Sequence, residues 1–140
     1  MAYNDFTLDA VMQQFGLKVV SVPDMFAHAT PVAANPLLTE TLTSFMPLAL
    51  NIGTEKSRSE FIIAPVLADT WRKFEGAVIL FSGVDFTVDA EVGLSGVCDY
   101  LFSLTPPQLV VQAPAVAVVE AKNDNIANGL GQCMAEMLAA

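Results

Sequence analysis

The sequence has few charged residues, and very few of these are basic. Only 15% of its 140 residues are charged, with six Lys and Arg against fifteen Asp and Glu, so the formal net charge is −9. Proteins that bind nucleic acid usually carry a basic surface. The composition therefore argues against strong intrinsic affinity for nucleic acid. A nucleic-acid substrate would need help from a partner or an attached domain.

Long apolar runs and targeting features are also absent from the sequence. No stretch of about 18 uninterrupted apolar residues occurs, as a membrane-spanning helix would need. Residues 1–5 have neither the basic nor the apolar region of a signal peptide. We therefore expect a cytoplasmic protein with no membrane partner. The two cysteines, Cys98 and Cys133, lie in apolar stretches without metal-type spacing, which favours reduced, buried thiols.

Apolar residues, in contrast, are plentiful. They make up 54% of the sequence, and the mean hydropathy is +0.52. A chain of this length is expected to form one compact domain. Because so small a domain has much apolar surface to hide, we expect either a homo-oligomer or a piece of a larger protein.

Residues 1–54 are expected to form a helical extension with a loop. Residues 7–16 fit a short helix, because Thr7 can cap its start, apolar residues recur at helical spacing, and Gly16 can end it. Residues 18–22 fit a short strand that Pro23 would end.

A loop and a second helix should complete this extension. Residues 23–36 contain three prolines and no clear period, which indicates a loop. The single histidine, His28, lies in this loop, and a lone loop histidine is more often an ordinary surface residue than a functional group. Residues 37–51 fit a helix that Pro47 would kink or split.

Residues 55–74 fit a second, more informative helical stretch. One face combines an acid with apolar residues at helical spacing: Glu60, Ile63, Leu67 and Trp71. This face should pack on a sheet, with Glu60 at its end. Alternatively, Glu60 is a first-turn acid that complements the helix dipole. Pro65 should either bend the helix or start a new one.

Three β-type segments follow, joined by short turns. The first comprises residues 77–82 and the alternating residues 84–89, the second covers 94–104, and the third covers 109–122 with an interruption at Pro114. Residues 105–108 read as a turn. Consecutive strands with short connections predict an antiparallel meander.

A final helix is expected after a cap formed by residues 123–125. Its core stripe should consist of Ile126, Leu130, Cys133 and Met137. Its polar stripe should consist of Asn125, Asn128, Gln132 and Glu136. The chain is therefore predicted to be an α+β protein in which a helix precedes the meander and another follows it.

The most unusual feature is the pair of strands that carry charge. Residues 116–119 are apolar, and they end in Glu120-Ala121-Lys122. Asp99 lies within a second β-type run. If the strands pair, two carboxylates and an ammonium can converge, which is costly unless a cation or a proton compensates. Carboxylate oxygens favour a hard cation, so this pattern suggests a Mg²⁺ site beside a lysine.

Asp99, Glu120-Ala121-Lys122 and Gln132 on a following helix resemble the PD-(D/E)XK nuclease superfamily. The pattern is closest to that of type I restriction and recombination-type nucleases. The similarity covers about Ser57 to Ala140, and it implies a restriction-endonuclease-like core over residues 55–140. Because the chain ends at Ala140, we expect the closing strand of that core to be absent, which would leave an exposed sheet edge.

The resemblance implies a Mg²⁺-dependent DNA nuclease in which Mn²⁺ can substitute. The metal ligands would be Asp99, Glu120 and the carbonyl of Ala121, with Glu60 acting through water. Lys122 would orient or activate the attacking water. Gln132 would position the lysine or the phosphate, or it is an ordinary solvated residue.

Other classes of function stay open from the sequence. The charged trio could be a structural salt-bridge cluster at a sheet edge. The chain could also be a nuclease-fold module that binds or assembles without cutting, or an unrelated α/β small-molecule binder that would have no metal affinity.

Overall fold

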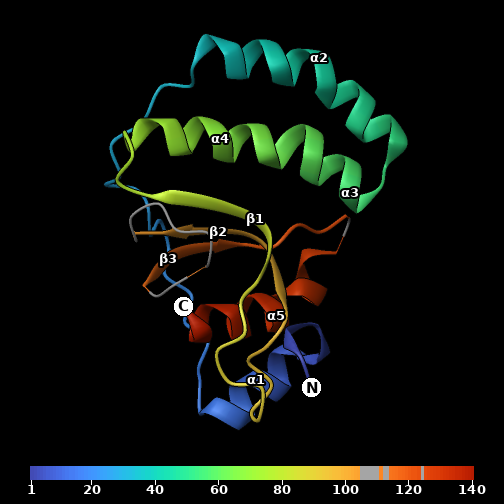
Figure 1. Cartoon of the computed structure of the whole chain (residues 1–140), viewed down its shortest axis with the longest axis vertical. Helices are drawn as coiled ribbons and strands as arrows, with labels where there is room; N and C mark the ends of the chain where they lie inside the picture. Colours follow the sequence, from blue (N-terminus) through green and yellow to red (C-terminus); the bar gives the residue numbers. More distant parts are fainter. Residues whose placement is uncertain (105–110, 112–113, 124) are drawn as a thin grey trace.

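Helices cover both faces of a three-stranded sheet in this protein (Figure 1). The computed structural model describes residues 1–104, 111, 114–123 and 125–140. The elements in chain order are η1 (Tyr3–Asp5), α1 (Leu8–Phe15), α2 (Pro36–Ile52), α3 (Glu55–Arg58), the π-helical η2 (Ser59–Ile63), α4 (Ala64–Lys73), β1 (Ile79–Asp85), β2 (Val97–Ser103), β3 (Ala115–Val119) and α5 (Ile126–Ala139). The expected α+β class is confirmed. Within the described part of the chain, no helix has the length and apolar character to cross a membrane.

The sheet is the predicted antiparallel meander, with strand order β1-β2-β3. Tyr100 at its centre pairs with Ser82 of β1 and with Val119 of β3. The first β-type segment is one strand as far as Asp85, and it passes through Gly83 at a φ of 60°. The expected turn at 105–108 and part of the third predicted segment lie outside the described residues.

The N-terminal helix forms as its local sequence predicts. Thr7 Oγ1 accepts a hydrogen bond from Ala10 N at 3.2 Å, and Gly16 ends α1 with a left-handed φ of 66°. The expected strand at residues 18–22 is wrong, because these described residues are largely exposed and pair with no strand. A strand needs a neighbour for its backbone groups. The loop predicted for residues 23–36 is confirmed as far as Asn35, because Pro36 already begins α2, and His28 is exposed in this loop.

The N-terminal residues complete the main core on the α5 side of the sheet. Tyr3, Phe6 and Val11 are buried together with residues of the sheet, the β1–β2 connection and α5: Phe86, Leu94, Cys98, Leu101, Ala135 and Ala139. The Tyr3 hydroxyl donates to the carbonyl of Phe86 at 2.5 Å. Residues 1–15 are therefore required to cover this face of the sheet.

The other face of the sheet is covered by a helical layer, with α2 outside it (Figure 1). The helical stretch predicted for residues 55–74 runs through α3, η2 and α4 without a loop. Pro65 lies in the first turn of α4, directly after the π-helical turn, and the backbone stays helical through Ile63 and Ala64, so only the hydrogen-bonding pattern changes there. The helix α2 continues through Pro47.

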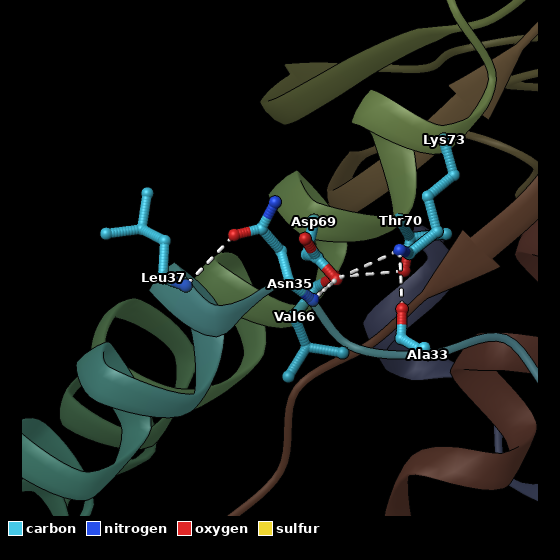
Figure 2. Close-up of polar contacts among 7 residues, drawn as sticks. All are labelled: Ala33, Asn35, Leu37, Val66, Asp69, Thr70 and Lys73. Atoms are coloured by element: carbon cyan, nitrogen blue, oxygen red, sulfur yellow. Dashed lines mark hydrogen bonds and ion pairs between the residues drawn. The ribbon is translucent and has the colours of Figure 1, made fainter.

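A polar cluster fixes the start of α2 on α4 (Figure 2). The buried Asp69 carboxylate accepts a hydrogen bond from Asn35 N at 3.3 Å and lies 3.7 Å from Lys73 Nζ. Lys73 also donates to the carbonyl of Ala33 at 2.6 Å, and Asn35 Oδ1 caps the helix by accepting from Leu37 N at 2.9 Å. Beyond this cluster, α2 leaves large apolar side chains exposed, among them Leu37, Met46 and Leu50.

The final helix is present, but its predicted core stripe is wrong. Ile126 is 73% exposed and Met137 is 65% exposed, whereas the residues that α5 buries are mostly small: Gly129, Gly131, Ala135, Glu136 and Ala139. The reason is a close approach to the N-terminal segment. A Cβ at Gly131 would lie only 2.3 Å from the carbonyl oxygen of Phe6.

The predicted cap of α5 is only partly described. Asn125 occupies the N-cap position, but in the described structure its side chain makes no capping hydrogen bond. The orientation of α5 is therefore set by packing of its small residues and not by its largest apolar side chains or its cap.

Candidate functional site

The acid on β2 lies beside the residues that follow β3. Tyr100 pairs with Val119, so one further step of the same register sets Asp99 opposite Glu120. The Asp99 carboxylate accepts a hydrogen bond from the backbone N–H of Ala121 at 2.8 Å. Residues 120–122 lie just beyond the end of β3. The meander therefore brings the two charged segments together, as the sequence predicts.

Glu120 and Lys122 form a close ion pair. Lys122 Nζ lies 2.7 Å from Glu120 Oε1, and the Glu120 side chain is only 7% exposed. Burial raises the pKa of Glu120, the hydrogen bond from Lys122 opposes that rise, and the charge of Asp99 adds to it. Burial lowers the pKa of Lys122, but the bond and charge of Glu120 outweigh burial, so the net direction is upward. The lysine therefore stays charged and compensates the buried glutamate.

The second carboxylate oxygen of Glu120 differs from the first, because it does not take part in the ion pair. In the described part of the chain, Glu120 Oε2 is buried and has no hydrogen-bond partner. A buried carboxylate oxygen without a donor is costly. This oxygen is therefore suited to accept a cation, a proton or a donor from a ligand.

Two neighbouring cavities divide the predicted site residues. Asp99, Glu60 and Ala121 line a polar cavity of about 250 Å³, together with Glu55, Lys56, Ser59, Ser82, Gly83 and Tyr100. Glu120 and Lys122 line a second, more apolar cavity of about 240 Å³, with Ile63, Ile126, Gly129, Leu130 and Cys133. Glu120 and Lys122 therefore line one cavity, and Ala121 between them lines the other. Asp99 and Glu120 do not line the same cavity.

The predicted acid of the first core helix reaches the polar cavity. Glu60 lies in the π-helical turn, and its carboxylate pairs with Lys56 at 3.1 Å with both side chains well exposed. The buried Tyr100 holds this turn, because its hydroxyl lies 2.8 Å from Ser59 Oγ and 3.1 Å from the carbonyl of Ser59. The π-helical turn is thereby joined to the same strand that carries Asp99.

The loop after Lys122 is attached to the same helical stretch. The Arg58 guanidinium donates to the backbone carbonyl of Asn123. This contact links α3 to the segment that holds Glu120 and Lys122. The site is therefore supported from the sheet, from the first core helix and from the loop that enters α5.

The final helix carries Gln132, which lines neither of these two cavities, and Glu136, which the sequence predicts on the same polar stripe. Gln132 is half-buried, and its Nε2 donates to Glu136 Oε1 at 3.0 Å. Glu136 is 0% exposed. Burial raises its pKa to about 7, the Gln132 hydrogen bond opposes the rise, and the charges of Glu120 and Asp99 add to it. Glu136 therefore experiences the field of the same acids.

The sequence contained one signal that could have revealed Glu136. Gln132 and Glu136 are spaced to share a helix face, and glycines or alanines lie close to that face at Gly131, Ala135 and Ala139. Small residues beside a polar stripe allow it to approach another element closely. The larger apolar residues of α5 gave the stronger, misleading signal.

The cysteines do not add a reactive group to the site. Both are free, as expected, with Cys98 buried and Cys133 half-buried. Burial raises the pKa of Cys98 to about 12 and also raises the pKa of Cys133. Since the thiolate is the nucleophile and the metal ligand, these thiols are structural groups at neutral pH.

The oxygen atoms of the site are of the kind that a hard cation binds, but they are not arranged around one common position. Asp99, Glu120 and the carbonyl of Ala121 offer the oxygen atoms that Mg²⁺ and Mn²⁺ prefer. Within the described residues, no group of three His, Cys, Asp or Glu side chains lies close enough to hold a metal ion. The unpartnered Oε2 of Glu120 is the clearest feature that a cation would satisfy.

Comparison with known proteins adds no assignment. No protein-family model matches the chain, and neither a curated protein nor a solved structure is significantly similar to it. The function has to be inferred from the residues and their geometry.

Proposed function

We propose that this chain is the catalytic core of a Mg²⁺-dependent DNA nuclease that resembles the PD-(D/E)XK superfamily. The observation that carries the proposal is the position of Asp99. Its carboxylate is bonded to the backbone between Glu120 and Lys122 at 2.8 Å, where the meander meets the first core helix. The order of helix, antiparallel meander and helix supports the same reading. Gln132 follows on the next helix.

The metal would be held by Asp99, Glu120 and the carbonyl of Ala121, with Glu60 contributing through water. When bound, Mg²⁺ or Mn²⁺ lowers the pKa of a coordinated water and neutralises charge on a phosphate oxygen. These donors fit in their chemistry, because all of them are oxygens and Glu120 Oε2 is buried without a partner in the described structure.

The remaining steps belong to side chains of the chain itself. Lys122 stays protonated beside Glu120, so its ammonium can orient the attacking water and stabilise negative charge on the phosphate as the P–O bond breaks. Gln132 can bind the same water or a phosphate oxygen through its amide. Tyr100 and Ser59 hold the π-helical turn that presents Glu60 to the polar cavity.

DNA is the proposed substrate, with help from a partner or an attached domain. A net charge of −9 gives little of the electrostatic attraction that usually drives binding to the phosphate backbone. The site residues can supply the groups needed for cleavage, while a basic surface elsewhere would supply affinity for DNA. Cleavage by the chain alone should therefore be weak, and strong dependence on ionic strength should appear only when such a basic surface is supplied.

Self-association through α2 is part of the proposal. Its outer face carries a groove of about 610 Å³ lined by apolar residues that include Leu38, Leu42, Met46 and Leu50. Glu40 is the only charged residue of the helix, so two acidic chains can meet there with little repulsion. Analytical ultracentrifugation should show a dimer that strengthens at high salt, and a Leu42→Glu variant should be monomeric. A wild-type monomer at all salt concentrations would contradict this part.

A second candidate is a nuclease-fold module that binds or assembles without cutting. The specific observation in its favour is the separation of the acids, because Asp99 and Glu120 line different cavities and Glu120 is already paired with Lys122 at 2.7 Å. In this alternative the ion pair is permanent and Asp99 only supports the backbone of Ala121.

Calorimetric titration with Mn²⁺, run beside incubation with supercoiled plasmid, separates the two candidates. The variants are Asp99→Asn and Glu120→Gln, which remove charge at nearly constant volume. The control is Glu91→Gln, an exposed acid in the β1–β2 connection. The nuclease predicts Mn²⁺ binding and nicked or linear plasmid for wild type and control, with both lost in the two site variants.

The other outcomes have distinct meanings. Metal binding without cutting, unchanged when a basic DNA-binding domain is fused to the chain, would favour the non-cleaving module. Cutting that survives in Asp99→Asn or Glu120→Gln would refute the site. Absence of any Mn²⁺ binding would refute the metal-dependent function itself.

A further inference from the structure

An arm, residues 18–35, joins α1 to α2 and runs along one side of the molecule, from the α5 side of the sheet to the helical layer on the other side (Figure 1). Its ends are fixed, since Leu17 packs against the main core and Lys73 donates to the carbonyl of Ala33 at 2.6 Å. Every residue from 18 to 37 is nevertheless exposed. The arm therefore crosses the surface with its side chains largely in solvent.

The middle of the arm presents an aromatic ring to solvent. Phe26 is 79% exposed, the highest fraction of any large apolar side chain in the described structure. A turn holds this position, because Ala27 N donates to the carbonyl of Asp24 at 2.9 Å. Pro23 and Pro31 restrict the backbone on either side of it. The ring is thus displayed at a preformed position, which lowers the entropy cost of binding it.

An apolar cavity of about 420 Å³, here called the α2–α4 cavity, lies beside the groove of α2. Its apolar walls include Val32, Val66 and Phe74. Ala34 and Leu38 line both the cavity and the groove, so the two are continuous. The charged residues of the lining, Asp69 and Lys73, lie 3.7 Å apart and neutralise one another. The cavity is therefore suited to receive an aromatic side chain.

The distribution of charge favours a second copy of the chain as the partner of the arm. Residues 19–54 contain no Lys or Arg and only two acids, Asp24 and Glu40, in a chain with a net charge of −9. Nucleic acid and anionic membranes are attracted by basic residues, which this part of the chain lacks. Two acidic chains can approach through a nearly uncharged surface with little repulsion.

The size of a stable interface leads to the same partner. Such an interface takes about 20–30 residues from each side. The helix α2 has 17 residues, and part of its surface already packs on the helical layer. The groove of α2 is therefore too small to hold two copies together by itself. The arm leads directly into α2 and provides the additional surface.

We propose that each copy lays its arm on the partner, so that Phe26 inserts into the α2–α4 cavity of the second copy. The inference rests on the self-association proposed above, and it adds the contact that aligns the two copies. The exchange is reciprocal, so both rings are buried and the assembly closes as a dimer. An aromatic side chain that fills a pocket typically carries a large share of the binding energy of an interface.

Dissociation constants from analytical ultracentrifugation test the role of Phe26. Phe26→Ala should weaken the dimer by about thirtyfold or more, as expected for a hot-spot side chain. Its circular dichroism spectrum should not change, because the exposed ring contributes little to the fold of its own chain. Val66→Lys places a charge in the cavity and should weaken the dimer although it lowers the net charge. The control is Met137→Ala, at an exposed position of α5 on the opposite face of the sheet, and its dimer should be as tight as wild type.

A photoreactive residue at position 26 tests the contact directly. A chain with p-benzoylphenylalanine in place of Phe26 is mixed with isotope-labelled wild-type chain and irradiated. The expected product is a covalent dimer in which residue 26 is joined to a labelled peptide that contains residues 66–74. Cross-links that form only within one chain, or that join residue 26 to another surface of the second copy, would overturn the proposal.

The failure of the arm contact can be told apart from the failure of self-association. A wild-type chain that is monomeric at all salt concentrations would overturn both. A dimer that is as tight in Phe26→Ala and Val66→Lys as in wild type would overturn the arm contact alone. A monomeric chain whose residue 26 becomes cross-linked to phosphatidylcholine vesicles or to an unrelated protein would assign the arm to that partner and overturn the proposal.

Discussion

Substitution by alanine should destabilise the protein at Gly131 but not at Gly129, the two glycines of α5. A Cβ at Gly131 would lie 2.3 Å from the carbonyl oxygen of Phe6, 2.5 Å from the carbonyl carbon of Thr7 and 2.7 Å from Leu8 N. All three are backbone atoms, so no rotamer change can relieve the overlap. At Gly129, the nearest atoms are Cε and Cγ of the Lys122 side chain, both at 2.9 Å, and this flexible chain can move.

The change in the free energy of unfolding at Gly131 follows from two opposing contributions. Overpacking costs about 1–3 kcal/mol, and the upper end applies at Gly131 because α5 or the N-terminal segment must shift as a unit. Alanine in place of glycine within a helix returns ~1 kcal/mol. Gly131→Ala should therefore lose ~2 kcal/mol, or roughly 6–10 °C in melting temperature for a chain of this size. Gly129→Ala should be as stable as wild type or slightly more stable.

Urea titration followed by circular dichroism measures both variants against wild type. The midpoint should fall for Gly131→Ala at an unchanged slope, which separates lost stability from a changed unfolded state. Equal stability of the two variants would refute the proposed close contact between α5 and residues 6–8. Gly129→Ala should also reduce plasmid cutting if the chain is a nuclease, because it displaces Lys122.

Three further results are expected. The pKa of Glu136 is raised to about 7, so the folded protein holds this proton more tightly than the unfolded chain does, and stability is lost as the pH rises through about 7. The stability gained by Glu136→Gln, measured by urea titration, should therefore be larger at pH 8 than at pH 5, and a gain independent of pH would contradict this assignment. Thr7→Ala removes the acceptor for Ala10 N and should cost ~1 kcal/mol in the free energy of unfolding, whereas no loss would show that the cap is not formed. Tyr3→Phe removes the buried hydrogen bond to the Phe86 carbonyl and should cost about 1–3 kcal/mol, with an unchanged melting temperature counting against that bond.

Local signals in the sequence were enough for the elements that depend on neighbours along the chain. The cap at Thr7, the stop at Gly16 and the alternating segments of the meander each act within a few residues. The strand expected at residues 18–22 failed because a strand also needs a partner, and the described sheet offers none to these residues. A high β propensity does not by itself form a strand when no neighbouring strand pairs with the backbone.

The sequence allowed prediction of which strands meet at the candidate site, but not of the detailed arrangement of its side chains. Asp99 and residues 120–122 could be brought together from the meander alone, and their observed contact follows from the register. The separation of Asp99 and Glu120 into two cavities could not be predicted, because it depends on how the chain turns after β3. Glu136 was missed because the approach of Gly131 to the backbone of residues 6–8 is a tertiary contact that overrides the apolar period of α5.

The single tryptophan gives the molecule an internal optical probe at a useful place. Trp71 lies on α4, is 42% exposed, and donates its indole N–H to the carbonyl of Val78, just before β1, at 3.1 Å. Its fluorescence therefore reports the junction between the helical layer and the sheet, whereas far-ultraviolet circular dichroism reports the helices and the sheet together. If the fluorescence changes at a lower denaturant concentration than the circular dichroism, the junction between α4 and the sheet opens before the rest of the chain unfolds.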